Sequence, residues 1–322
     1  MDFRIGDDQQ ALQEGVRSFC EGRVPLDRLR ELEGPGFDPG LWKELAEMGV
    51  FSLRLPEEEG GVGLGTSEAV LVFEELGRAL VPGPLWASHL AAGRIPGAAE
   101  GEAAVAGLDL VQASREPLVL EHLGACSTLL VLRPEGVFGV DPAGVEARPL
   151  DPPLDPLTPV HLAGELPPGE ALGDAALARQ LWLEGATLTA AQLLGIAEAA
   201  QELATAYAKK REQFGRPIGS FQALKHILAD CYVRQEMARA AVYAAGATLD
   251  GRGVDAPERA VSVARVMATE AAIRNTRACV QVHGGMGYTW EMPPHHYLKR
   301  AYVLAASFGS VDEHAEELGA EV

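Results

Sequence analysis

The spacing of apolar residues changes twice along this chain of 322 residues, and these changes limit the folds that it can adopt. From about residue 7 to residue 94, apolar residues recur at helical spacing, as in Leu12, Val16 and Phe19. Between about residues 100 and 173, short β-favouring runs alternate with glycine and proline, which keeps any strands short. Helical spacing returns from residue 175. The sequence therefore predicts a helical part, a β part and a second helical part.

We expect an α+β multidomain fold in three parts. These are an N-terminal all-α domain (1–98), a small central β barrel or sandwich (99–173) and a C-terminal four-helix bundle (174–322) that carries oligomer contacts. In the middle domain, strands are expected over 128–133 and 136–140. Helices are expected over about 67–80, over 175–250 with a break at 215–219, and over 257–283.

The charge balance excludes two classes of partner. The chain has 46 acidic and 27 basic residues and a formal charge of −19, so its field repels nucleic acid and anionic membranes. No apolar run approaches the roughly 20 residues that a membrane span requires. The first ten residues lack the basic and apolar regions of a secretion signal. We therefore expect a cytoplasmic protein without a nucleic-acid or membrane partner.

The residues that most often bind metals are dispersed. The 4 cysteines lie far apart and form no Cys-x-x-Cys pair, and the 8 histidines show no ligand spacing. We expect free thiols and no metal site.

A polar loop between two helical stretches is the first candidate binding segment. It lies within Tyr207–His226, where Arg211 and Arg216 flank exposed backbone N–H groups and Phe214 stands next to a glycine. Guanidinium and N–H groups suit a pyrophosphate, and a phenylalanine ring can pack on an adenine or ribose. By itself, however, such a loop is also compatible with an ordinary helix hairpin whose arginines are solvated.

The second candidate segment is Val280–Pro293, which is punctuated by glycines at 284, 285 and 287. Glycine lets another backbone or a ligand approach closely. The segment is not a dinucleotide fingerprint, because it follows a helical pattern rather than a strand.

Taken together, these segments resemble the acyl-CoA dehydrogenase family. The Pro-Glu-Glu-x-Gly-Gly-x-Gly stretch from Pro56 and the Glu74–Arg78 stretch resemble that family's first domain. The resemblance implies an FAD that is held mainly by a neighbouring subunit, with contacts from this chain at Arg211, Gln213, Phe214, Gln222, Gln281, Gly284 and Gly285. It also implies oxidation of an acyl-CoA to its trans-2-enoyl-CoA, with the electrons passing through FAD to electron-transfer flavoprotein or a similar acceptor.

The sequence departs from the family at the catalytic base. Ser307–Ser310 aligns with the family's segment ending in Glu-Gly-Thr, so Phe308 occupies the base position and cannot accept a proton. Some relatives carry the base at the start of the first long helix of the last domain, and Glu184 lies one residue from that place. An offset of one residue turns a helical side chain by about 100°. Glu184 is therefore expected to be a helix-start or surface carboxylate.

The central domain also departs from the family. It lacks a Thr-Glu-Pro segment with a following Gly-Ser, and it lacks the tryptophan-containing strand that lies against the flavin ring in the family.

Three hypotheses remain open at this point. The chain is a base-lacking partner in a mixed α2β2 acyl-CoA dehydrogenase, or it is a self-sufficient homo-oligomer that uses Glu184 or another carboxylate as base. The third hypothesis is a folded relic that binds only acyl-CoA. The two departures favour the partner hypothesis, because both affect the half of the site that another subunit could supply.

Overall fold

The computed structural model describes residues 5–112, 117–253 and 256–320. The chain divides into two compact units. One, which we call the bundle unit, comprises the chain up to Leu26, Val70–Val81 and the chain from Thr189 onward; the other, the β-containing unit, comprises Asp27–Ala69 and Pro82–Leu188. The predicted domain limits at residues 1 and 322 lie outside the described residues, and the three-domain division stays a prediction.

In the β-containing unit, two sheets face each other across a shared core. The first has the order β1 (Val105–Asp109), β3 (Thr128–Arg133), β4 (Gly136–Val140) and β7 (Glu170–Asp174), and the second has the order β2 (Leu118–Glu121), β6 (Val160–Ala163) and β5 (Ala147–Pro149). β1 pairs with β3 in parallel, and the other neighbouring strands are antiparallel. Side chains from both sheets form one core, so the predicted central β domain is a sandwich. The strands expected at 128–133 and 136–140 are confirmed.

Short helices complete this unit: η1 (Leu26–Arg28), α2 (Leu29–Leu32), α3 (Pro39–Glu47), η2 (Glu57–Glu59), α5 (Leu85–Ala91) and η3 (Pro142–Gly144). Helix α5 packs directly on β1. A Cβ atom added to Gly107 would lie 2.0 Å from the Trp86 ring, so only glycine leaves room for that indole. The Ser88 hydroxyl also exchanges hydrogen bonds with the backbone N–H and carbonyl of Val105, at 2.9 and 3.1 Å. These contacts fix the chain that follows α5.

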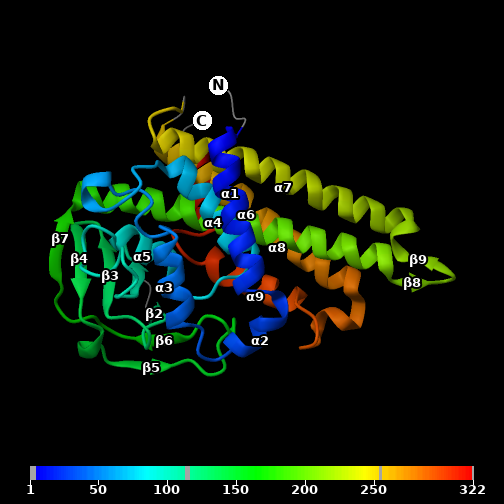
Figure 1. Ribbon diagram of the computed structural model, residues 1–322, viewed down its shortest axis with the longest axis horizontal. Helices are drawn as coiled ribbons and strands as arrows, with labels where there is room; N and C mark the ends of the chain where they lie inside the picture. The colour runs from blue at the N-terminus through cyan, green and yellow to red at the C-terminus, as the bar shows by residue number, and fades with distance from the viewer. Residues whose placement is uncertain (1–4, 113–116, 254–255, 321–322) are drawn as a thin grey trace. The chain divides into compact units, whose positions relative to one another are not determined.

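Long helices build the bundle unit: α1 (Asp7–Arg23), α7 (Gln222–Leu249), α8 (Pro257–His283), α9 (Pro294–Ala305) and α10 (Val311–Ala320), together with parts of α4 (Thr66–Arg78) and α6 (Ala175–Lys210). The long ribbons of α7 and α8 run side by side in Figure 1. The helical bundle, the break near residues 215–219 and the helix over 257–283 were all predicted and are confirmed. Within the described ranges, no helix has the length and apolar character that crossing a bilayer requires.

Inside the bundle unit, α4 and α6 meet backbone to backbone. A Cβ atom on Gly195 would lie 1.9 Å from the Glu74 carbonyl oxygen, and one on Gly77 would lie 2.2 Å from the Gln192 carbonyl oxygen. Neither position therefore accepts a larger residue without moving a helix.

This contact surrounds a network of buried charges. Glu74, with 0% exposure, accepts hydrogen bonds from Arg239 and from the Tyr243 hydroxyl, both at 2.7 Å. Glu75 pairs with Arg17 at 2.7 Å. Arg78 pairs with Glu198 and Glu202, and the carboxylates in this group outnumber the guanidiniums. Burial raises the pKa of Glu74 to about 7 despite Arg239, and neighbouring Glu198 adds to that rise.

We predict that Gly195→Ala lowers the free energy of unfolding by at least about 2 kcal/mol, because the added methyl group overlaps the α4 backbone. Urea denaturation followed by circular dichroism measures the change. Gly15→Ala is the control, since Gly15 lies in the exposed face of α1 and an added Cβ meets nothing within 4 Å. The control should gain about 0.5–1 kcal/mol from helix propensity. Equal stabilities of the two variants would contradict the tight contact.

Candidate functional site

The first candidate segment forms a short hairpin after the end of α6. Strand β8 (Glu212–Gln213) pairs with β9 (Arg216–Pro217), and Phe214 and Gly215 make the turn. Phe214 has φ +54° and is 92% exposed, which is an unusual combination for a bulky apolar residue. Arg211, Gln213 and Arg216 are exposed as well. The hairpin therefore presents cations, an amide and an aromatic ring to the outside of the bundle unit.

The base of this hairpin is held by aromatic contacts. The Phe221 ring lies edge-on to Phe214, with the ring centroids 6.0 Å apart, and the Arg216 guanidinium lies 4.2 Å from the Phe221 centroid. Gln222 follows as the first residue of α7 and is exposed. Left-handed backbone at a residue with a side chain costs free energy and is typical of binding segments.

The second candidate segment begins at the end of α8. Gly284 closes the helix with φ +61°, and η5 (Gly284–Tyr288) follows. Gln281, Gly284 and Gly285 are exposed, and a Cβ atom added to either glycine would meet nothing within 4 Å. The backbone is thus open to a ligand at these glycines.

The two segments lie together at one end of the bundle unit. The rings of Tyr207 and His283 stack with their centroids 4.1 Å apart. Beneath them, side chains from the end of α6 and the end of α8 share one apolar cluster with Ile218 and with the first turns of α7. Residues separated by about 70 positions in the sequence are thereby gathered around one surface.

This surface fits the pyrophosphate part of a dinucleotide. Its backbone is unobstructed at Gly284 and Gly285, Arg211 and Arg216 supply positive charge, and Phe214 offers an exposed ring. The residues that the sequence singled out as FAD contacts have the chemistry for such a group, and their roles stay predictions.

The residue that the sequence predicted at the family's base position is a buried phenylalanine. Phe308 is 1% exposed, has φ +55° and lies between α9 and α10. Its carbonyl oxygen lies 2.8 Å from Nε2 of His314, and the preceding carbonyl, of Ser307, accepts a hydrogen bond of 2.6 Å from Arg265. The loop is held by backbone contacts, and residue 308 brings no proton acceptor to it.

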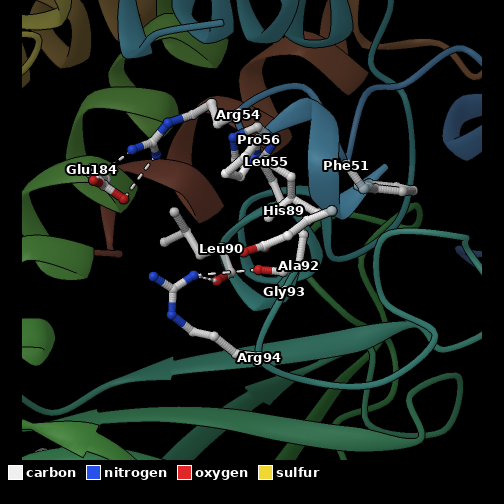
Figure 2. A pocket seen from close by; sticks show the side chains of 11 residues that line it. Phe51, Arg54, Leu55, Pro56, His89, Leu90, Ala92, Gly93, Arg94 and Glu184 are labelled. Atoms are coloured by element: carbon white, nitrogen blue, oxygen red, sulfur yellow. Dashed lines mark hydrogen bonds and ion pairs between the residues drawn. The ribbon is translucent and has the colours of Figure 1, made fainter. Parts of the chain in front are cut away.

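Glu184 is placed differently from the expectation. It is the tenth residue of α6, is 5% exposed and lines a pocket in the β-containing unit, so the prediction of a helix-start or surface carboxylate was wrong. The cause is Arg54, whose two terminal nitrogens donate to the two carboxylate oxygens at 2.7 and 2.8 Å (Figure 2). A paired guanidinium makes burial of the carboxylate tolerable.

The ion pair also sets the protonation of Glu184. Burial acts to raise its pKa, but the hydrogen bonds and charge of Arg54, with a hydrogen bond of 2.9 Å from Gln180, leave the pKa below its ordinary value. A carboxylate held in this way is a weak base. Whether Glu184 acts as a base in catalysis stays a prediction.

Sequence reasoning missed Arg54, His89 and Arg94, which line the same pocket. Arg54 lies 130 residues before Glu184, and no motif or spacing connects the two. Within the described part of the chain, no group of three or more His, Cys, Asp or Glu side chains could hold a metal ion. The four cysteines are free thiols.

Two family models match most of the chain. Residues 6–100 match the acyl-CoA dehydrogenase N-terminal domain, and residues 176–322 match the acyl-CoA dehydrogenase C-terminal domain. The acyl-CoA dehydrogenase IpdE2 of Mycolicibacterium smegmatis is 35% identical over 338 residues, which cover 99% of this chain and 100% of that protein.

Solved structures of two assemblies share the fold. A chain of the ChsE4-ChsE5 complex from Mycobacterium tuberculosis has a TM-score of 0.85 and 25% identity, covering 100% of this chain and 98% of that one. A chain from a variant of the Tcur3481-Tcur3483 steroid ACAD has a TM-score of 0.84 and 27% identity, covering 98% of this chain and 97% of that one.

We predict that Arg54→Gln destabilises the protein by about 3 kcal/mol at pH 8, because it leaves the Glu184 carboxylate buried and unpaired. In the wild type, the lowered pKa of Glu184 contributes stability at neutral pH that is lost as the pH falls through that pKa. In the variant, the lowering effect of Arg54 is lost while burial still acts to raise the pKa of Glu184, so the destabilisation should shrink at pH 5. Urea denaturation at both pH values measures this.

Arg274→Gln is the matched control for this experiment. Arg274 pairs with Glu270 at 2.7 Å on the surface, with side-chain exposures of 60% and 43%. Its loss should cost less than about 1 kcal/mol at either pH. A loss in Arg54→Gln as small as that in the control would contradict the importance of the buried pair.

Proposed function

Because this chain belongs to the acyl-CoA dehydrogenase family, we propose that it is the base-lacking subunit of a heteromeric acyl-CoA dehydrogenase. A catalytic homologue supplies the base and most of the flavin site. The assembly oxidises an acyl-CoA thioester to the 2-enoyl-CoA and passes the electrons to electron-transfer flavoprotein or a similar acceptor.

The buried phenylalanine at position 308 carries this proposal. Removal of the α-proton of a thioester requires a positioned proton acceptor. Phe308 has none, and the hydrogen bonds from Arg265 and His314 fasten the backbone on which it stands. The other carboxylate near a family base position, Glu184, is neutralised by Arg54.

FAD, when bound, accepts the hydride from the substrate. This chain binds the pyrophosphate and adenosine part of that cofactor. Arg211 supplies positive charge and Phe214 packs its ring on the cofactor. Gln281 and the backbone at Gly284 and Gly285 form hydrogen bonds. Gln213 and Gln222 add amide groups on the same hairpin and helix start. The exposure of all these residues supports a cofactor that is held chiefly by a neighbouring subunit.

Exposed apolar side chains support a partner. Tyr232, Val233 and Met237 lie on neighbouring positions of α7 and are 53–55% exposed. Tyr288 and Trp290 near η5 are 76% and 56% exposed. Apolar groups gathered in this way are typical of protein interfaces. Two structural relatives, ChsE4-ChsE5 and Tcur3481-Tcur3483, are named as pairs of proteins.

We predict that the full chain purified alone contains little flavin and does not reduce a dye with acyl-CoA. Co-expression with a homologue that has glutamate at the base position should give a complex with bound FAD and turnover. Flavin absorbance per complex and dye reduction are the measurements. Stoichiometric flavin with turnover in the chain alone would overturn the proposal.

Phe214→Ala tests this chain's contribution within the complex. Alanine also has a Cβ atom, so the backbone at residue 214 has the same left-handed conformation to adopt. The variant therefore removes only the aromatic ring. We expect flavin retention to fall several-fold. Leu154→Ala, at a residue in the β-containing unit with 55% exposure, is the control and should retain flavin normally.

The alternative is a self-sufficient enzyme that uses Glu184 as base. Burial of Glu184 beside a pocket favours it, whereas the ion pair with Arg54 opposes it. On our proposal, Glu184→Gln in the assembled complex leaves kcat within about 3-fold of the wild type, since the partner supplies the base. A loss of 10²-fold or more, the usual size of a general-base effect, would establish the alternative.

A further inference from the structure

The pocket beside Glu184 has features that its ion pair does not explain. Its volume is 310 Å³, at the lower end of the range for small-molecule sites. All its lining residues belong to the β-containing unit, and they are separate from the hairpin and glycines assigned to the flavin. Apolar walls come from Phe51, Leu55, Pro56, Leu90 and Ala92, and the charged or titratable groups are Arg54, Glu59, His89, Arg94 and Glu184.

Most of the charge inside this pocket is neutralised. Arg54 and Glu184 cancel each other through their two hydrogen bonds. His89 lies at the Val50 carbonyl, 2.8 Å from its Nδ1, and burial lowers the pKa of His89 to about 4, so the ring is neutral at pH 7. These three residues therefore make a polar wall without net charge.

Arg94 is the second arginine of the lining, and it is an exposed residue. Its Nη1 donates to the carbonyl oxygens of Leu90 at 3.1 Å and Ala92 at 3.3 Å, at the end of α5. Among the described residues, no carboxylate pairs with its guanidinium within 4.0 Å. Figure 2 shows the guanidinium reaching back along the pocket beside Leu90, on the side where Arg54 and Glu184 lie.

Two glutamates partly compensate the charge of Arg94 without pairing with it. Burial of part of the side chain lowers the pKa of Arg94, and Arg54 lowers it further, while Glu184 and Glu59 act in the opposite direction. Glu59 is exposed on η2 and is therefore largely solvated. The lining thus contains two arginines and two glutamates, and Arg94, an exposed residue, is the arginine that forms no ion pair with either carboxylate next to the apolar walls.

We propose that this pocket binds the carboxylate of a small organic acid, with the carboxylate on the guanidinium of Arg94 and the hydrocarbon body against Phe51, Leu55 and Leu90. A guanidinium presents parallel N–H donors that match the two oxygens of a carboxylate. The apolar walls disfavour inorganic phosphate, which has no hydrocarbon part. A body of about six carbon atoms fits within 310 Å³.

Calorimetric titration of the full chain with hexanoate, 1-hexanol and inorganic phosphate tests the proposal. Hexanoate should bind at least 10-fold more tightly than either of the others, because hexanol lacks the charge and phosphate lacks the apolar body. In a methyl-labelled sample, the Ala92 and Leu90 resonances should shift with hexanoate. Equal affinity for hexanoate and hexanol, or shifts confined to other methyl groups, would overturn the proposal.

Substitutions of single arginines test which positive charge binds the carboxylate of hexanoate. Arg94→Gln should weaken hexanoate binding by about 10-fold or more, as expected for loss of a charge-assisted hydrogen bond. Arg94→Lys keeps the charge without the planar donors and should bind with intermediate affinity. Arg30→Gln removes one exposed positive charge from α2 in the same unit and is the control. The proposal fails if Arg94→Gln and Arg30→Gln bind hexanoate as tightly as the wild type.

Discussion

Helices α4 and α6 contact each other through their backbones, because Gly77 and Gly195 leave no side chain between them. This contact brings Glu74, Glu75 and Arg78 next to Glu198 and Glu202 of α6. The negative charges of these glutamates therefore need positively charged partners inside the bundle unit. Arg239 of α7 and Arg17 of α1 complete the network. The positions of four helices therefore depend on two residues without side chains, and the end of α6 carries the candidate flavin hairpin.

Two buried carboxylates of this protein have pKa values that are shifted in opposite directions. In the bundle unit, Glu74 shares a network with more acids than bases, so burial raises its pKa toward neutrality. In the β-containing unit, Glu184 accepts two hydrogen bonds from Arg54, and its pKa stays low. The difference bears on function, since general-base chemistry at neutral pH needs a raised pKa at an accessible site. Glu74 lies in the interior with no exposure, and Glu184 is neutralised.

Two features that cost free energy lie on the outside of the bundle unit. Phe214 combines a left-handed backbone with a ring that is almost fully exposed, and α7 exposes further apolar side chains. A partner or a flavin that covered these groups would offset both costs. Phe308 also has left-handed backbone, but it is buried and held by Arg265 and His314, so that strain is already balanced within the chain. This contrast supports the proposal of a subunit that contacts the cofactor without supplying the catalytic base.

The sequence by itself determined the order of the elements, because hydrophobic period and glycine or proline positions act locally. Helix α8 and strands β3 and β4 have the predicted limits, whereas the replacement of the family's base by Phe308 stays a prediction. The resemblance also selected the segments that the fold then brought together at Tyr207 and His283. Only the tertiary structure decided the surroundings of Glu184. Its burial and its pairing with Arg54 depend on contacts between residues far apart in the chain, and no local pattern encodes such contacts.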